Sequence, residues 1–114
     1  MTNQITIRKA PGKWSVRSGG AILGETNNAL ELLEGENDPV IYFPRSDIAM
    51  AFLDRSDKVI HDPIKGKATH FSIVNRSSVA ENAAWSFENP GEAIAQLKDY
   101  LAFYPEDSIK VEQL

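Results

Sequence analysis

The chain has 114 residues, of which 42% are hydrophobic and 25% charged, with a net charge of −4 and no cysteine. This length and composition are typical of one globular domain, which we expect to span residues 1–114. The acidic balance argues against nucleic acid as a partner, and the absence of cysteine excludes disulfides and cysteine-based zinc sites.

The location of the protein is predicted from what the chain lacks. Residues 1–10 have no apolar core of a signal peptide, and no run approaches the ~20 apolar residues of a membrane span. We therefore expect a cytoplasmic protein with no membrane partner. We expect no cofactor and no metal, because only two histidines remain as soft ligands.

The first part of the chain predicts β-structure. The runs 5–7 and 14–17 alternate between polar and apolar residues with period two. Gly19-Gly20 supplies a tight turn, and the apolar run 21–23 follows it. We therefore predict strands joined by a hairpin at this turn.

A short helix is predicted next. Residues 29–34 are rich in helix formers, follow Asn27-Asn28 and end at Gly35. Asn at the start and Gly at the end are typical of a helix that is capped at both ends.

A buried strand over residues 40–43 is predicted from a run of β-branched and aromatic residues. Arg45 follows this strand directly. Ser46 or Asp47 then caps another short helix, and residues 54–57 return to a loop.

Two long strands are predicted in the second half of the chain. They cover 69–74 and 79–87, and the polar turn 75–78 is short enough for antiparallel pairing. Within the first of them, alternation places His70 on the solvent face. Before them, residues 61–66 hold Pro and Gly among polar groups, which predicts an irregular segment.

The clearest helix start lies near the C-terminus. Asn89 is expected as N-cap, Pro90 takes the first helical position, and Glu92 completes a reciprocal cap. The apolar residues that follow recur at helical spacing and are Ile94, Leu97, Leu101 and Tyr104. We therefore predict an α+β domain of mainly antiparallel strands, with short helices and one long C-terminal helix packed on the sheet.

Arg45 and Asp47 are candidate site residues because they follow the end of a strand, where a rigid backbone aims polar side chains. Arg is suited to bidentate contact with carboxylate or phosphate. The same two residues are equally consistent with an internal Arg45–Asp47 pair or a helix cap.

A second group of candidates lies between the strands. His61, Asp62, Lys65 and Lys67 bring a titratable ring, an acid and two ammonium groups into seven residues. This mixture suits anion binding or proton transfer, although His61 is also consistent with a surface residue in a turn. Trp85 lies among small alanines and is either the floor of a pocket or part of the core.

Four ordered segments, which span nearly the whole chain, resemble a known family. They are Tyr42-Phe43-Pro44-Arg45-x-Asp47, His61-x-Pro63-x-Lys65-Gly66-x-Ala68, Ala83-Ala84-Trp85-Ser86-Phe87 and Ala102-Phe103-Tyr104. Together they resemble the domain of unknown function family 427, which is sometimes catalogued under a nucleotidyltransferase-like label. The resemblance implies tent-like or barrel-like sheets. Asp62 and Ile64 stand where many members have Cys and an aromatic residue.

The residues that match the family pattern are our site candidates, namely Arg45, Asp47, His61, Lys65 and Trp85. We expect them to bind an anionic small molecule bearing phosphate or carboxylate, and leave open whether catalysis follows. Arg45 and Lys65 would hold the anion, Asp47 would orient Arg45, His61 would be the catalytic donor or base, and Trp85 the floor. The alternative is a non-enzymatic interaction or structural module whose motif residues stabilise the fold.

Overall fold

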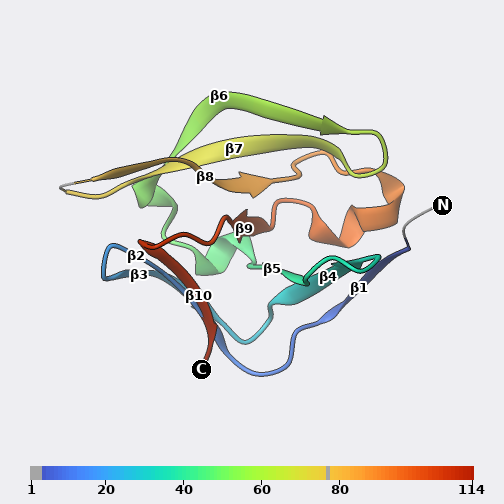
Figure 1. The fold of residues 1–114 in the computed structure, drawn as a ribbon, viewed down its shortest axis with the longest axis horizontal. Coiled ribbons are helices and arrows are strands. Elements are labelled where there is room, and N and C mark those ends of the chain that lie inside the picture. The colour runs from blue at the N-terminus through green and yellow to red at the C-terminus, as the bar shows by residue number, and fades with distance from the viewer. Residues whose placement is uncertain (1–3, 77) are drawn as a thin grey trace.

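Three antiparallel sheets make up the fold in the computed structural model, which describes residues 4–76 and 78–114 (Figure 1). Ser77, in the predicted turn 75–78, lies outside the described residues. In sheet order, the first sheet contains β1 (Ile5–Lys9), β4 (Leu30–Glu34) and β5 (Val40–Tyr42). The second contains β10 (Ile109–Gln113), β2 (Trp14–Ser18) and β3 (Ala21–Thr26). The third contains β6 (Leu53–Asp62), β7 (Gly66–Val74), β8 (Val79–Ser86) and β9 (Leu101–Phe103), and in Figure 1 it lies above the other two.

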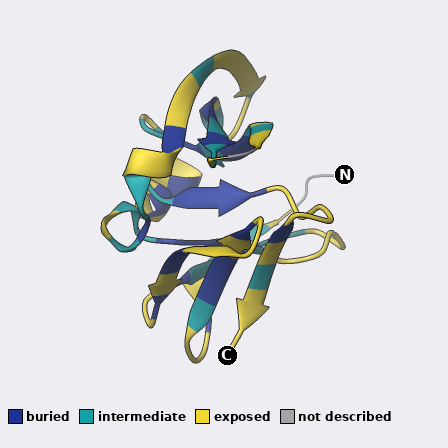
Figure 2. Ribbon diagram, turned by 90° about the vertical axis from the view of Figure 1, so that its left-hand side faces the viewer, coloured by how far each residue is buried: buried dark blue, intermediate teal, exposed yellow. Residues whose placement is uncertain are grey.

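Strand β9 lies at the centre of the molecule and separates two apolar cores. All three of its residues are buried, and it is a strand drawn dark blue in Figure 2. Leu101 and Phe103 belong to one core, which the second and third sheets enclose, whereas Ala102 belongs to the other. Successive residues of a strand face opposite sides, so one short strand contributes to both cores.

The predicted long C-terminal helix is wrong, and with it the predicted α+β class. Residues Glu92–Leu97 form only a 3-10 helix, η3, which is interrupted by the non-helical dihedrals of Ile94 (φ −128°, ψ 29°). Asp99 (φ 67°) then turns the chain into β9. No long helix occurs in residues 4–76 or 78–114, and the fold is mainly antiparallel β.

Pairing on both sides explains why residues 101–103 form a strand. β9 pairs with β8 on one side, and Leu101 exchanges backbone hydrogen bonds of 2.8 and 2.9 Å with Phe43 on the other. The helical spacing of Ile94, Leu97 and Leu101 arises because all three are buried, the first two in η3 and the third in β9. Apolar spacing alone cannot separate these two structures.

The predicted helix over 29–34 is also wrong, since Leu30–Glu34 form β4. This strand pairs with β1 and β5, and such tertiary pairing overrides a moderate helix propensity. Glu31 lies opposite Arg8 in the register, and their side chains form an ion pair of 2.6 Å. Leu32 and Glu34 share the other face of the strand, which turns Glu34 toward the hairpin of β6 and β7.

The segment after β5 is less helical than predicted. The second predicted helix is replaced by two single 3-10 turns, η1 (Arg45–Asp47) and η2 (Met50–Phe52). Residues 54–57, predicted as a loop, belong to β6, whose register with β7 shifts between Arg55 and Val59. The predicted antiparallel pairing of β7 with β8 is confirmed.

Candidate functional site

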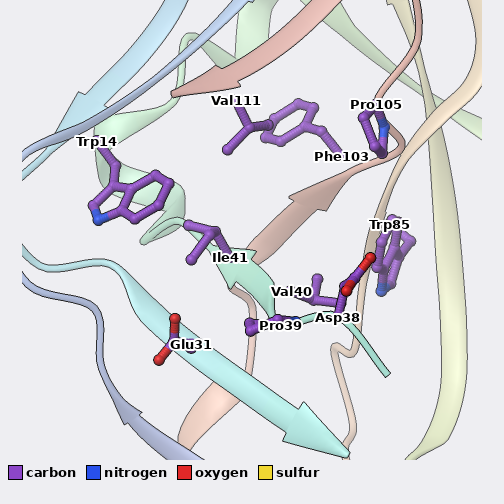
Figure 3. A pocket seen from close by; sticks show the side chains of 10 residues that line it. All are labelled: Trp14, Glu31, Asp38, Pro39, Val40, Ile41, Trp85, Phe103, Pro105 and Val111. Carbon is purple, nitrogen blue, oxygen red and sulfur yellow. The ribbon is translucent and has the colours of Figure 1, made fainter. Parts of the chain in front are cut away.

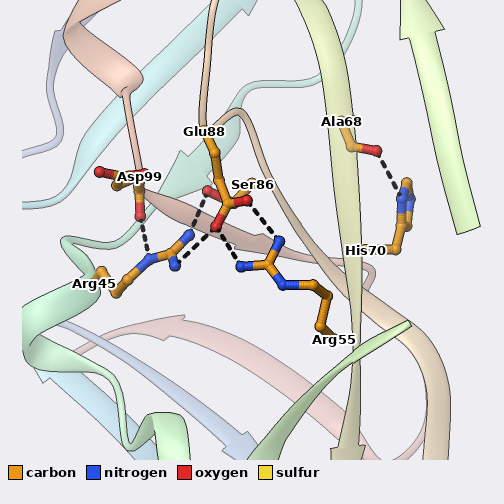
Figure 4. A network of polar contacts seen from close by, with 7 residues as sticks. All are labelled: Arg45, Arg55, Ala68, His70, Ser86, Glu88 and Asp99. Atoms are coloured by element: carbon orange, nitrogen blue, oxygen red, sulfur yellow. Dashed lines mark hydrogen bonds and ion pairs between the residues drawn. The ribbon is translucent and has the colours of Figure 1, made fainter. Parts of the chain in front are cut away.

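Arg45 is held by groups of the protein itself. It lies at the start of η1, and its Nε donates to the backbone oxygen of Asp99 at 2.9 Å. Nη1 donates to Glu88 Oε2 and Nη2 to Ser86 Oγ, both at 3.0 Å (Figure 4). Every guanidinium nitrogen therefore has an internal acceptor, and the side chain is only 28% exposed.

A second arginine completes this cluster. Arg55 on β6 donates to both carboxylate oxygens of Glu88, at 2.6 and 2.9 Å. Its hydrogen bonds, followed by those of Arg45, hold the pKa of Glu88 below its usual range. Both guanidinium groups also lie over the ring of Phe71, at 5.5 and 5.2 Å from its centroid. Among the described residues, Asp47 forms no ion pair with Arg45, so the expected orienting contact is replaced by Glu88.

Lys65 lies at the turn between β6 and β7 and connects this hairpin to β4. Its Nζ is 2.6 Å from Glu34 Oε1 and 3.5 Å from Asp62 Oδ2, and its side chain is 16% exposed. Asp62 accepts the backbone N–H groups of Lys65 and Ile64, at 2.9 and 2.8 Å, and these bonds lower its pKa. Residues 63–65 therefore form an ordered hairpin turn, and residues 61, 62 and 66 belong to β6 and β7, in place of the irregular segment that we predicted.

Trp85 on β8 lies against two tyrosines. Its Nε1 donates to Tyr42 Oη at 3.2 Å, and the two rings meet edge to face with centroids 6.1 Å apart. The ring of Tyr104 also packs against the indole, with a centroid distance of 4.4 Å. Burial raises the pKa of Tyr42 to about 12, so its hydroxyl keeps its proton at neutral pH.

His70 is fully buried, which contradicts the predicted solvent-facing position. Alternation correctly placed it opposite Phe71, but β7 is an inner strand that is covered on both faces. Nδ1 lies 3.3 Å from the backbone oxygen of Ala68, and Nε2 lies 3.0 Å from Tyr104 Oη. A carbonyl only accepts hydrogen bonds, so Nδ1 carries the proton and, in the neutral ring, Nε2 accepts the proton of Tyr104.

His61 is exposed on β6, where Lys67 is its partner in the register. Its neighbours Ile60 and Asp62 both line a depression beside Trp85. Successive residues of a strand face opposite sides, so His61 points away from that depression. The structure does not bring His61 together with Arg45 or Lys65.

Two depressions share Trp85 and Val40. The larger, of about 490 Å³, has apolar walls that include Trp14, Ile41 and Phe103 (Figure 3). The smaller, of about 200 Å³, is lined by polar and aromatic groups of Glu34, Tyr42, Asp62, Lys65 and Tyr104. Of the five predicted site residues, the structure places Lys65 and Trp85 here, and Arg45, Asp47 and His61 elsewhere.

Sequence reasoning missed four of these lining residues, namely Glu34, Asp38, Tyr42 and Tyr104. Tyr42 and Tyr104 belong to the segments that carry the family resemblance, and this signal was sufficient to select them. Glu34 was missed because residues 29–34 were predicted to form a helix, whereas Glu34 lies on β4. Asp38 lies in the loop between β4 and β5 and had no sequence signal that linked it to Trp85.

We expect His70 to remain mostly neutral at pH 6.5, the ordinary pKa of histidine, because burial disfavours the imidazolium and lowers its pKa. The unfolded chain binds this proton more readily. Folding stability therefore falls as the pH drops through about 6.5 toward the folded-state pKa. A histidine NMR titration measures the pKa, and His70→Gln assigns the signal. A His70 signal that titrates at or above 6.5 would contradict this expectation.

Comparison with known proteins identifies the family. No curated protein matches the chain. Within residues 4–76 and 78–114, the structure has no helix that is long and apolar enough to cross a membrane. The family model described as "Domain of unknown function (DUF427)" matches residues 6–114, nearly the whole chain, which confirms the resemblance seen in the sequence. The chain therefore belongs to the DUF427 family.

Proposed function

We propose that this domain binds a small organic molecule at Trp85, where the two depressions meet. The observation that carries the proposal is that the Trp85 indole lines both depressions and lies against Tyr42 and Tyr104. Small-molecule sites are commonly concave and apolar with a few converging polar groups, and have volumes of roughly 300–1,000 Å³. The depression of about 490 Å³ lies within this range.

The polar groups that would orient the ligand converge on the smaller depression. Lys65, Glu34 and Asp62 supply charged groups that contact one another, and Tyr42 and Tyr104 supply hydroxyls beside Trp85. Side chains of five strands, β4, β5, β6, β7 and β8, contribute to the wall, so the site stands on regular structure. Such placement favours a preformed site over one that has to be ordered by its ligand.

The Arg45 cluster supports a structural role for its own residues. Arg45 was expected to hold an anion, but its donors are directed to Ser86, Glu88 and Asp99. For this part of the family pattern, the alternative of motif residues that stabilise the fold is favoured. The proposed binding site therefore excludes Arg45.

The test is a ligand screen that covers cations, anions and neutral molecules at millimolar concentration. A binder raises Tm, by an amount that reflects about 2.7 kcal/mol at one hundred times Kd. Backbone NMR shifts of the unsubstituted chain locate each binder, because a ligand at Trp85 shifts the signals of the residues that line the two depressions.

We expect Trp85→Leu to lose this binding, while the control Ile22→Ala, at an exposed position on β3, retains it. Circular dichroism shows whether each variant folds. If Trp85→Leu does not fold, Tyr104→Phe tests the same wall of the site by removing its hydroxyl. The proposal fails if no compound binds, or if binding survives both Trp85→Leu and Tyr104→Phe.

A further inference from the structure

The surroundings of Trp85 are acidic. Glu31 and Asp38 line the larger depression, and Glu34 and Asp62 line the smaller one. Among the described residues that line either depression, Lys65 is the only cation, and it already contacts Glu34 and Asp62.

Ion pairing leaves part of this negative charge uncompensated. Arg8 offsets Glu31 at 2.6 Å, so four carboxylates face two cations and a surplus of two negative charges remains. Asp38 is exposed and forms no ion pair with the described residues. An anionic ligand would be repelled by this surplus, whereas a cation would be attracted.

The aromatic side chains favour the same sign of charge. The faces of Trp and Tyr rings carry negative potential and attract a cation within about 6 Å of the ring centroid, with Trp the strongest. Trp85 and Tyr104 form one such wall, and Trp14 lies on the larger depression together with Asp38 (Figure 3).

Several hydrogen-bonding groups around Trp85 are acceptors, so they suit a ligand that donates hydrogen bonds. Tyr104 donates its proton to His70 Nε2, so the lone pairs of its oxygen are free to accept a hydrogen bond. Tyr104 is 37% exposed and lines the smaller depression, which lets a ligand reach this oxygen. The carboxylates of Glu34 and Asp62 are acceptors too. An ammonium group has only donors and matches this set.

From charge, aromatic faces and hydrogen-bond polarity together, we infer that the ligand is an organic cation, a small molecule whose ammonium group lies at Trp85. The inference rests on the proposed function, and it replaces the anionic ligand expected from the sequence. The ammonium lies against the indole and the Tyr104 oxygen, and Asp38 attracts it from the open side of the larger depression.

Three probes of similar size separate the possible charges, namely benzylammonium, benzyl alcohol and benzoate. Backbone NMR shifts of the unsubstituted chain measure the Kd of each probe and locate it. We expect the cation to bind at least about tenfold more tightly than the other two, the ratio that ~1.4 kcal/mol of cation–π and charge attraction produces. Added salt is expected to weaken the binding of the cation and not that of the other two probes.

Asp38→Asn is expected to weaken binding of the cation several-fold without changing Tm, because Asp38 is exposed. Asp57→Asn makes the same change of charge at an exposed position on β6 outside both depressions, and it should leave Kd unchanged. Equal effects of the two substitutions would overturn the role of Asp38.

The inference and the proposed function fail in different ways. Benzyl alcohol or benzoate binding at Trp85 as tightly as the cation overturns the cationic ligand but supports a binding site there. If neither the probes nor the wider screen perturb Trp85, both the inference and the proposed function are overturned.

Discussion

Arg45→Ala is expected to lower the free energy of unfolding by about 3 kcal/mol. The substitution removes hydrogen bonds to Ser86 Oγ, Glu88 Oε2 and the Asp99 backbone oxygen. Ser86 is fully buried, so its hydroxyl cannot turn to water for a replacement. Asp99 adopts a left-handed conformation (φ 67°) at the turn into β9, and Arg45 fixes this turn.

Urea denaturation measures this loss, and Arg55→Ala is the matched control. Arg55 contacts the same carboxylate but is 55% exposed, and an exposed ion pair contributes less than about 1 kcal/mol. Arg45→Lys should be intermediate, because one ammonium group cannot span three separate acceptors. A neutral or stabilising Arg45→Ala would instead indicate a functional arginine that is retained at the expense of stability.

Gly91→Ala is expected to destabilise the protein by about 3 kcal/mol, at the upper end of the effect of overpacking. A Cβ at this position would lie 2.2 Å from the backbone oxygen of Ile64, which a rigid turn cannot move easily. Gly91 has ordinary dihedrals (φ −64°, ψ 163°), so the cost arises from this contact and not from backbone strain. Its N–H also donates to the backbone oxygen of Lys65 at 3.0 Å.

Urea denaturation of Gly20→Ala separates the cost of a steric contact from the cost of backbone strain. A Cβ at Gly20 meets nothing within 4 Å, but the residue has a φ of +86°. We expect a smaller loss of about 1 kcal/mol from backbone strain alone. Because Gly91 abuts the turn that holds Lys65, Gly91→Ala should also shift the NMR signals of Lys65 and Asp62. A loss no larger than that of Gly20→Ala would show that the turn adjusts freely.

Local patterns were sufficient for most of the strands. The alternating runs 5–7 and 14–17 and the long run 69–74 lie within observed strands, and the apolar run 40–43 does so except for Phe43, which follows the end of β5. Period-two alternation and β-branched residues are local properties, so they can be recognised without knowing the partner strand. Membership of DUF427 was likewise evident from four short segments of the chain.

Other segments depended on their partners. Residues 30–34 and 101–103 have apolar spacing that fits a helix as well as a strand, and each forms a strand because hydrogen-bonding partners lie on both sides. For His70, alternation identified the correct face of β7, and only the position of Tyr104 shows that this face is covered.

The sequence by itself determined the family, most strands, and Trp85 and Lys65 as residues of interest. The tertiary structure decided which groups each predicted site residue contacts. Arg45 is joined to Asp99, 54 positions away, and Lys65 to Glu34, 31 positions away. Charge, hydrogen bonding and burial at a site depend on distances in space between such residues. A linear pattern does not contain those distances, so it could name Arg45 and Lys65 but could not show that carboxylates of the protein already neutralise both.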